Sequence, residues 1–547
     1  MVKNKIISIS IFAAILSVIS ASLYAKTVYV IEFNDFHGML YEHHLDRDVV
    51  SGALYFESAV ENKPDSNSTD ADATELPGAV QLSNIIMKNS LKDNEGKNAV
   101  VVSGGDNYQG TVVSYDTKGL PVNDMFRLIE TKVSAIGNHE FDWGTKYFEQ
   151  WQKEGDFTFV AANLLDEKTG DCPACCKPYV IETVDGVKIA FIGLVTVETT
   201  VTTSAKNLVG FKIIDPWIAA QKWIDYLKEG KDPQGKPDVI IALTHIPSSQ
   251  DENGKILGEE INSLCAKTKG FDAVLSAHSH LRVCGTINDI PVLQAQCYGK
   301  MYGILEIKVD DKTNKLESVK PFVYEVSYTD KTIAENSVGN ILEKYQDIEK
   351  KYARVLGKTP GIPYDPRTLS PLGVYMAELM ARASDCQVAL VNPYGIRSGL
   401  DAGDIRVEDL FRISPFNNTL VSMNVTGSQL QKIMEYGLSG KIGCVQFYGL
   451  DVVYNSAKPV GQRIISMSLP DGTVIEKDKT YSLCVNDFMS TGGDGFNFEG
   501  AKDMKTHKEL FVRDLMMQDI EKRKILELPP ATELKDISKE EEQKEAA

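Results

Sequence analysis

The sequence predicts an α/β protein made of two domains joined by a helix, and three observations support this. The chain has 547 residues, which is too long for one ordinary hydrophobic core and suits two domains. In residues 26–330, short apolar runs alternate with amphipathic stretches, which is the pattern of β–α units. Residues 358–528 show the same alternation, and the segment between the two regions has helical periodicity. We therefore expect domains at 26–330 and 358–528.

The segment at 331–357 is predicted to be one long linking helix. Its apolar side chains recur at helical spacing, at Ile341, Leu342, Tyr345, Ile348, Tyr352 and Val355. Gly357 suits the end of a helix, and Pro360 lies just beyond it. Residues 66–75 are polar and are expected to form an exposed loop. Residues 529–547 are expected to form a mobile acidic tail.

Composition and charge narrow the possible functions. With 43% hydrophobic and 24% charged residues, the chain has the composition of a soluble globular protein. Its formal net charge of −18 argues against a protein that binds the backbone of a nucleic-acid polymer, because such binding needs a basic face. An acidic protein can still bind a small anionic substrate if the site supplies cations of its own.

Residues 1–25 have the form of a signal peptide. Lys3 and Lys5 precede an apolar stretch at 6–19, and Ala25 is a small residue suited to cleavage. A membrane anchor is the alternative, but the apolar stretch is short and interrupted by serines. The sequence thus predicts a periplasmic or secreted protein with no membrane span after signal removal.

Nine cysteines suit an oxidising compartment, although the odd number leaves at least one unpaired. Three of them, Cys172, Cys175 and Cys176, lie within D-C-P-A-C-C-K-P. This spacing also occurs in redox pairs and in half of a zinc site. The neighbouring glycine and prolines indicate a loop, which favours a structural disulfide; the pairing stays open.

Metal-ligating residues follow five of the predicted strands, at the point where each strand ends. The strands are 27–33, 99–103, 132–136, 239–243 and 273–275, and most of the eight histidines lie directly behind them. The residues in question are Asp35, His37, Asp106, Asn138, His139, Asp142, His245, His278 and His280. Because sites in α/β sheets gather at the carboxyl ends of strands, these side chains are expected to converge.

This mixture of Asp, Asn and His suits borderline metals such as zinc, manganese, iron or cobalt rather than calcium. Asp106, at the tip of a G-G-D turn, is our candidate for a carboxylate that bridges two ions. Two divalent metals about 3.5–4 Å apart bind a phosphate oxygen, generate hydroxide and stabilise an in-line displacement. The sequence therefore predicts a binuclear site, with zinc, manganese or cobalt as the leading choices.

The motifs D-F-H-G, S-G-G-D-N, G-N-H-E-F-D, T-H and A-H-S-H follow one another in the order of the metallophosphoesterase signature. The chain resembles the bacterial 5′-nucleotidase/UDP-sugar hydrolase family, with its animal ecto-5′-nucleotidase relatives, over about residues 26–528. The resemblance implies a four-layer metallophosphoesterase β-sandwich flanked by helices, followed by an α/β substrate-binding domain. It also implies a metal-dependent 5′-nucleotidase that releases phosphate from nucleoside 5′-monophosphates.

The same resemblance assigns roles to residues of the first domain. It implies one metal on Asp35, His37, Asp106 and His280, and a second on Asp106, Asn138, His245 and His278. His139 is then not a ligand: it contacts the phosphate and protonates the leaving oxygen, with Asp142 orienting it, which is a sound acid–base pair.

In the second domain, the resemblance implies a substrate pocket. Asn392 and Arg397 contact the phosphate, Phe416 and Phe488 sandwich the base, and Asp494 accepts from ribose hydroxyls. Two aromatic faces stack any flat ring, and a guanidinium matches phosphate geometry. Arg367 is the nearest candidate for a second phosphate-binding arginine. Taken singly, the two phenylalanines are better explained as core residues than as site residues.

Departures from the family pattern fall in this second domain. The chain has Asn392-Pro393-Tyr394-Gly395 where the family usually has N-G-G-G, and Val374 where Asn is common. UDP-sugar hydrolysis and 2′,3′-cyclic nucleotide phosphodiesterase activity therefore stay open as alternatives, as does a non-catalytic nucleotide-binding protein. The preferred nucleotide, the native metal and the oligomeric state do not follow from the residues.

Overall fold

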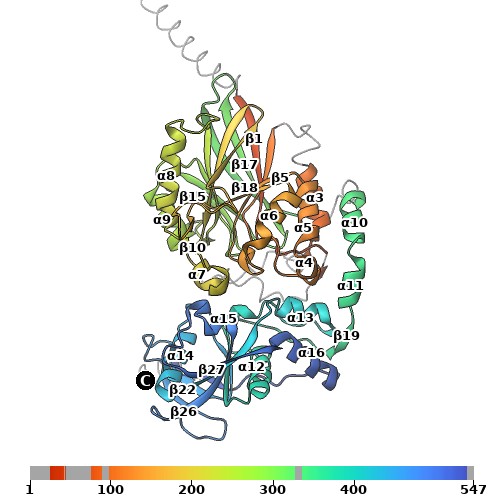
Figure 1. Cartoon of the computed structure of the whole chain (residues 1–547), viewed down its shortest axis with the longest axis vertical. Helices are drawn as coiled ribbons and strands as arrows, with labels where there is room; N and C mark the ends of the chain where they lie inside the picture. Colours follow the sequence, from red (N-terminus) through yellow and green to blue (C-terminus); the bar gives the residue numbers. More distant parts are fainter. Residues whose placement is uncertain (1–24, 42, 45–74, 89–97, 327–334, 539–547) are drawn as a thin grey trace, which may run out of the picture.

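The computed structural model describes residues 25–41, 43–44, 75–88, 98–326 and 335–538 (Figure 1). A larger domain at 25–326 lies above a smaller one at 355–538, and two helices connect them along one side (Figure 1). The predicted signal peptide and the polar loop at 66–75 lie outside the described residues, apart from the single positions Ala25 and Glu75. Within the described residues, no helix is both long and apolar enough to cross a membrane.

Two six-stranded sheets form the centre of the first domain. The first has the order β18-β17-β1-β4-β5-β6 and the second β15-β16-β14-β11-β9-β8. The first sheet contains β1 (Ala25–Phe33), β4 (Ala99–Ser103), β5 (Thr131–Ala135), β6 (Thr158–Val160), β17 (Met301–Asp310) and β18 (Leu316–Glu325). The second contains β8 (Tyr179–Val184), β9 (Val187–Val195), β11 (Val239–His245), β14 (Ala273–Leu275), β15 (Arg282–Ile287) and β16 (Ile290–Ala295).

The two sheets pack face to face, and helices cover their outer faces. Val28, Val100, Ile189 and Ile241 belong to one buried apolar cluster that both sheets share. The helices α3 (Gly78–Met87), α5 (Leu120–Leu128) and α6 (Phe148–Gly155) lie on one side, and α8 (Pro216–Lys228) and α9 (Glu259–Lys267) on the other (Figure 1). Alternate strand residues therefore face the sandwich and the helices, which confirms the predicted four-layer arrangement.

The predicted linking helix is interrupted. Helix α10 (Glu335–Glu343) and helix α11 (Gln346–Tyr352) are separated at Tyr345, whose backbone leaves helical geometry at φ −111° and ψ 3°. The Tyr345 hydroxyl donates to Asp124 of α5 at 3.2 Å, so a tertiary contact with the first domain accompanies the break. Helical spacing continues through such a break, which is why the sequence indicated one helix.

The end of the predicted helix is also corrected, because residues Val355–Thr359 form strand β19. This strand pairs antiparallel with β21 (Gly403–Arg406). Gly357 does not end a helix. A Cβ atom there would lie 2.8 Å from the carbonyl oxygen of Lys524, so glycine permits the close approach of the chain behind it.

The second domain is built on a five-stranded sheet of order β23-β20-β26-β22-β27. Its strands are β20 (Val388–Val391), β22 (Thr419–Thr426), β23 (Gln446–Tyr448), β26 (Thr480–Asn486) and β27 (Lys502–Phe511). One face packs on α12 (Pro371–Ser384) and α16 (Val512–Arg523), and the other on α14 (Gly427–Gly437). Helix α13 (Val407–Ile413) faces the first domain.

The predicted tail at 529–547 is not wholly mobile. Leu534–Asp536 form strand β28, which pairs in parallel with β24 (Asp451–Tyr454), and Leu534 packs against the core of the second domain. An apolar residue within a charged segment therefore anchors it, whereas residues 539–547 lie outside the description.

The predicted disulfide is not formed in the structure. All nine cysteines lie within the described residues, and all nine are thiols. The Sγ atoms of Cys172 and Cys176 are 3.5 Å apart, which is longer than an S–S bond of about 2.05 Å.

Candidate active site between the two domains

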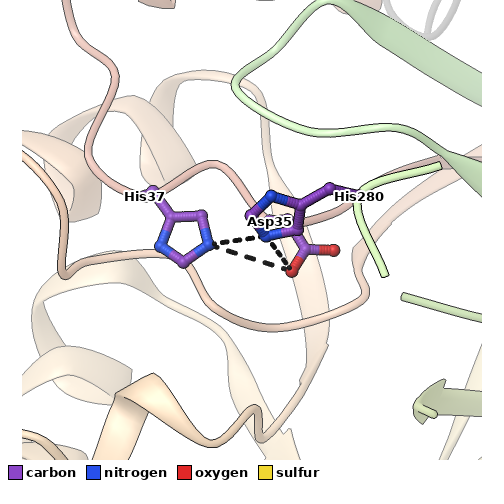
Figure 2. A group of neighbouring side chains, drawn as sticks. All are labelled: Asp35, His37 and His280. Carbon is purple, nitrogen blue, oxygen red and sulfur yellow. Dashed lines mark hydrogen bonds and ion pairs between the residues drawn. The ribbon is translucent and has the colours of Figure 1, made fainter. Parts of the chain in front are cut away.

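Seven predicted metal ligands lie together at the carboxyl edge of the two sheets. Strands β1, β4 and β5 run parallel in one sheet, and β11 and β14 run parallel in the other. The loops after these strands carry the ligands in two groups: Asp35, His37 and His280 (Figure 2), and Asp106, His245 and His278. The seventh, Asn138, follows β5 and lines the same cavity as Asp106, His278 and His280.

The first group points its donor atoms at one small volume. His37 Nε2 lies 3.1 Å from His280 Nε2, and His280 Nε2 lies 3.3 Å from Asp35 Oδ1 (Figure 2). On its outer side, His37 Nδ1 donates to the carbonyl of Gln109 at 2.7 Å. This bond places the ring proton on Nδ1, so the Nε2 lone pair faces inward, as a metal requires.

The second group repeats this arrangement. His245 Nδ1 donates to the carbonyl of Gly104 at 2.8 Å, while His245 Nε2 lies 3.1 Å from Asp106 Oδ2 and 3.2 Å from His278 Nδ1. Asp106 Oδ2 also lies 3.9 Å from His37 Nε2 of the first group. The Asp106 carboxylate therefore stands between the two groups.

Buried oxygen atoms without hydrogen-bond partners show that this donor set fits metal ions. Asn138 Oδ1 and Asp35 Oδ1 are both buried, and neither has a hydrogen-bond partner. An unsatisfied buried acceptor costs about 1–3 kcal/mol, so native proteins rarely keep one without a purpose. Two divalent ions held by these two oxygens and by the inward imidazole nitrogens would satisfy both groups.

Five of the seven predicted ligands adopt left-handed backbone angles. These are Asp35, His37, Asp106, His278 and His280, with φ between 50° and 73°. Each such residue costs about 1–3 kcal/mol and persists only where its surroundings enforce it. Here the loops bond to one another: the Asp35 amide donates to Gly105 O, and the His37 amide donates to Asp106 O, both at 2.9 Å. No sequence pattern predicted this strain.

Glu140 is a residue of the site to which the sequence analysis gave no role. It is fully buried, and its carboxylate accepts from the backbone amides of Asp106, Asn107 and Gly137 at 2.8, 2.7 and 2.6 Å. It therefore holds the loop after β4 against the loop after β5. A Cβ atom on Gly137 would lie 2.7 Å from Asp106 Cγ, so these loops meet too closely for a side chain there.

Glu140→Ala is expected to destabilise the fold and to reduce metal content. It removes the acceptor of three buried amides, each worth about 1–3 kcal/mol, so the free energy of unfolding should fall by about 3 kcal/mol or more. Urea unfolding and metal analysis measure both effects. Glu149→Ala, at an exposed position on α6, is the matched control. An unchanged unfolding midpoint for Glu140→Ala would contradict this role.

His139 and Asp142 form the predicted pair. His139 Nδ1 donates to Asp142 Oδ2 at 2.8 Å, and the His139 ring borders the cavity between the domains. Burial works against protonation of His139, but the carboxylates of Asp142 and Asp106 outweigh it and raise the pKa of the imidazole. His139 is therefore suited to hold a proton and donate it.

Predicted substrate-binding residues of the second domain line a cavity together with predicted metal-binding residues of the first domain. A cavity of about 430 Å³, within the range of small-molecule sites, lies between the two domains. Its lining includes Asp106, Asn138, His139, His278 and His280 from the first domain, and Asn392, Arg397, Phe416, Phe488 and Asp494 from the second. Burial lowers the pKa of His280, and the positive charge of Arg397 adds to this effect, whereas the Asp35 carboxylate opposes it. Arg397 and His280 line the same cavity.

Asn392 is bound within its own domain. Its amide nitrogen donates to Asp494 Oδ2 at 2.7 Å, and its oxygen accepts from Asn486 at 2.8 Å. Burial raises the pKa of Asp494 to about 6, although the bond from Asn392 opposes this. Asn392 thus orients the Asp494 carboxylate.

Arg367 is not brought into the cavity. Its side chain is exposed and pairs with Asp365, at 3.3 Å between Nη2 and Oδ2. The Asp365 carboxylate also accepts from the Arg367 amide, and Arg367 lies close enough to Tyr394 to act on the pKa of its hydroxyl. The phosphate-binding role of Arg367 stays a prediction. Tyr394, from the N-P-Y-G departure, does line the cavity.

Glu198 also lines the cavity, and the sequence analysis did not consider it. Its Oε2 lies 3.3 Å from His278 Nε2. The residue follows β9, the parallel neighbour of β11, so its position after that strand was the available signal.

Comparisons with known proteins agree with this architecture. Residues 33–282 match the model of the calcineurin-like phosphoesterases, and residues 355–501 match the model of the 5′-nucleotidase C-terminal domain. The chain belongs to the 5′-nucleotidase family of metallophosphoesterases. The predicted resemblance is thereby confirmed, and the family supports a hydrolase.

Relatives of this 5′-nucleotidase-family chain include an endonuclease, YhcR, of Bacillus subtilis, which is 32% identical over 425 residues. The match covers 73% of this chain, and the chain spans only about a third of that protein's length. Protein UshA of Yersinia enterocolitica is 25% identical, with 73% of this chain and 79% of UshA covered.

Among solved structures, a 5′-nucleotidase precursor from Thermus thermophilus shares the fold. The TM-score is 0.76 at 22% identity, and the match covers 93% of this chain and 99% of the other.

Proposed function

We propose that this protein is an exported phosphohydrolase that holds two divalent metal ions and releases phosphate from nucleoside 5′-monophosphates or closely related nucleotides. One observation carries the proposal. A single cavity between the domains is bordered by two groups of metal-ligating side chains, a His–Asp pair, an arginine and two phenylalanines. Export rests on the signal-like residues 1–25.

The proposed mechanism divides the work between the domains. Two ions held by the two donor groups would act as Lewis acids on the phosphate and lower the pKa of a water molecule. Arg397 binds the phosphate opposite them, because its guanidinium matches the geometry of phosphate oxygens. His139, held in orientation by Asp142, donates a proton to the leaving ribose oxygen.

The proposed nucleoside site uses the remaining lining residues. Phe416 and Phe488 offer flat faces to a base, and Asp494 accepts from ribose hydroxyls. The Tyr436 hydroxyl donates to the Asp494 carbonyl at 2.7 Å, so a second side chain fixes this segment. Tyr394 adds bulk near Arg397, which limits what can extend beyond the phosphate.

A substrate panel tests this function. Purified protein should release phosphate from AMP, EDTA should abolish the release, and zinc, manganese or cobalt should restore it. UDP-glucose and a 2′,3′-cyclic nucleotide, assayed in parallel, separate the two alternative activities. No EDTA-sensitive release from any of the three would overturn the proposal and favour a nucleotide-binding protein without catalysis.

Phe488→Ala should raise KM for AMP more than it lowers kcat. Stacking on one aromatic ring is worth about 1–3 kcal/mol per base, and it acts on the base in both the bound and the transition state. Steady-state kinetics with AMP and with ribose 5-phosphate measure the effect, because the second ester has no base. An equal rise in KM for both esters would contradict stacking by Phe488.

A further inference from the structure

Arg513, on helix α16, is a buried cation that the proposed mechanism leaves without a role. Only 6% of its surface is exposed. Its guanidinium donates to the carbonyls of Ser414 and Phe416 at 2.8 and 3.4 Å, and to the side-chain oxygen of Asn417 at 2.7 Å. All three acceptors lie in one loop, between α13 and β22.

That loop carries an aromatic residue of the cavity. The Phe416 ring lies nearly parallel to the His139 ring, with centroids 5.7 Å apart and an angle of 26° between the planes. Three donated bonds, to Ser414, Phe416 and Asn417, hold the loop that carries this ring. Arg513 therefore acts on the cavity through the loop, without lining the cavity itself.

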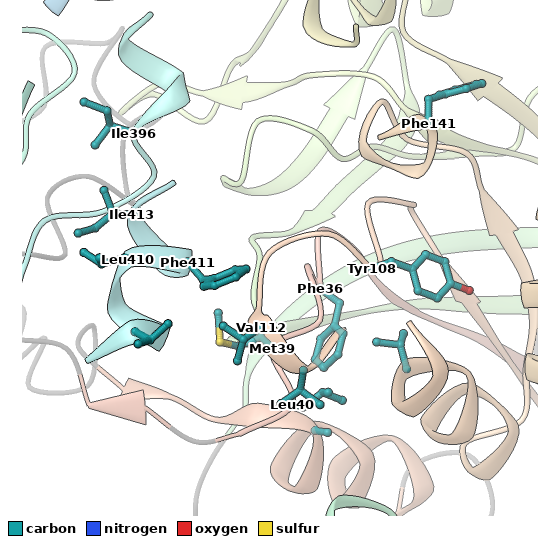
Figure 3. Close-up of a cluster of buried hydrophobic side chains, with 14 of the residues drawn as sticks. Phe36, Met39, Leu40, Tyr108, Val112, Phe141, Ile396, Leu410, Phe411 and Ile413 are labelled. Carbon is teal, nitrogen blue, oxygen red and sulfur yellow. The ribbon is translucent and has the colours of Figure 1, made fainter. Parts of the chain in front are cut away.

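The same guanidinium lies at the contact between the two domains. Its Cζ atom lies 3.5 Å from the centre of the Phe411 ring, which also packs on Tyr115 of the first domain at 5.6 Å. Figure 3 shows Phe411 on the second-domain side, beside Val112 and Met39 of the first. Asn417, which Arg513 holds, donates to the Tyr115 hydroxyl.

Burying this charge is costly, and stability alone does not explain it. The acceptors in contact with Arg513 are neutral, and burial lowers its pKa to about 10. An apolar residue of similar volume is often as stable or more stable at such positions, whereas directed bonds define one geometry.

We propose that Arg513 is a positioning residue that holds Phe416 in place to stack a nucleobase. Through Asn417, Arg513 also links this placement to the contact with Tyr115 of the first domain. This inference rests on the proposed function, in which Phe416 binds the base. It names a residue outside the cavity that sets the preference for a nucleotide over a phosphate ester without a base.

Arg513→Met tests the proposal because methionine fills similar space without donors. We expect kcat/KM for AMP to fall about tenfold and kcat/KM for ribose 5-phosphate to stay within twofold. Phe416→Ala should show the same pattern, and the double variant should lose no more than Phe416→Ala alone. Arg523→Met, on the same helix but paired with Asp519, is the matched control and should match the unsubstituted protein.

Three further measurements keep the test decisive. Arg513→Lys, which keeps the charge over Phe411, should recover part of the preference for AMP. Thermal unfolding reports whether each variant is folded. Equal losses for both esters, or additive losses in the double variant, would overturn the role. If the unsubstituted protein hydrolyses neither ester, the proposed function fails, and the Kd for adenosine by calorimetry still tests Arg513, with an expected tenfold weakening.

Discussion

Asp106→Asn is expected to abolish turnover and to leave fewer than two metal ions on each chain. Asp106 Oδ2 lies 3.1 Å from His245 Nε2 and 3.9 Å from His37 Nε2, so one oxygen faces both groups of ligands. Asparagine keeps the shape but removes the negative charge, and a neutral amide cannot offset two divalent cations at this distance. Metal analysis and phosphate release from AMP measure the two effects.

Asp35→Asn is the informative comparison. Asp35 Oδ1 lies 3.3 Å from His280 Nε2, in the first group, and also approaches His245 Nε2 at 3.9 Å. If Asp106 is the bridge, the Asp35→Asn variant should still bind one metal ion per chain. The Asp106→Asn variant should bind fewer metal ions per chain than the Asp35→Asn variant. The bridging assignment moves to Asp35 if the two variants show the reverse order. Two ions and near-normal turnover in Asp106→Asn would refute the binuclear site.

His139→Ala should lower kcat by roughly 10²–10⁴-fold while metal content stays near normal, because general acid catalysis contributes on this scale. His139 Nδ1 is bound to Asp142, and His139 belongs to neither group of ligands. The loss should be smaller for an ester with a good leaving group, such as p-nitrophenyl phosphate, which needs little protonation.

Asp142→Asn provides the second arm of this test. It keeps the size of the side chain but removes the charge that favours protonated His139, so kcat for AMP should fall by less than in His139→Ala. Normal turnover in His139→Ala, or loss of both metals, would remove His139 from its proposed role.

The convergence of the predicted ligands could be foreseen from the sequence for a physical reason. Strands such as 99–103 and 239–243 are continuous apolar runs, which is the sequence pattern of parallel strands that are buried on both faces. Because the carboxyl ends of parallel strands lie at one edge of a sheet, the polar residues that directly follow these strands come close together. The family resemblance carried by the G-N-H-E and A-H-S-H motifs implied which of these residues are ligands, and six of them form the two groups in the structure. Their role as ligands stays a prediction.

Other features depended on contacts that no local pattern encodes. The break at Tyr345 coincides with a bond to Asp124, which lies far away in the sequence. The Arg367 side chain is exposed and pairs with Asp365, a contact that the sequence pattern did not indicate. Leu534 joined a sheet in a segment whose charge alone indicated a mobile tail.

The sequence by itself determined the α/β class, the two domains and the identity of the groups that gather at the sheet edge, because periodicity and strand direction are local properties. Only the tertiary structure decided how those groups are held: the left-handed angles of five predicted ligands, the carboxylate of Glu140 between two loops, and the position of Arg397 and Phe416 in the cavity beside first-domain residues. These features arise where distant segments press on one another. The strain and the hydrogen bonds in these features depend on contacts between segments that are distant in the sequence, so no local stretch of the chain predicts them.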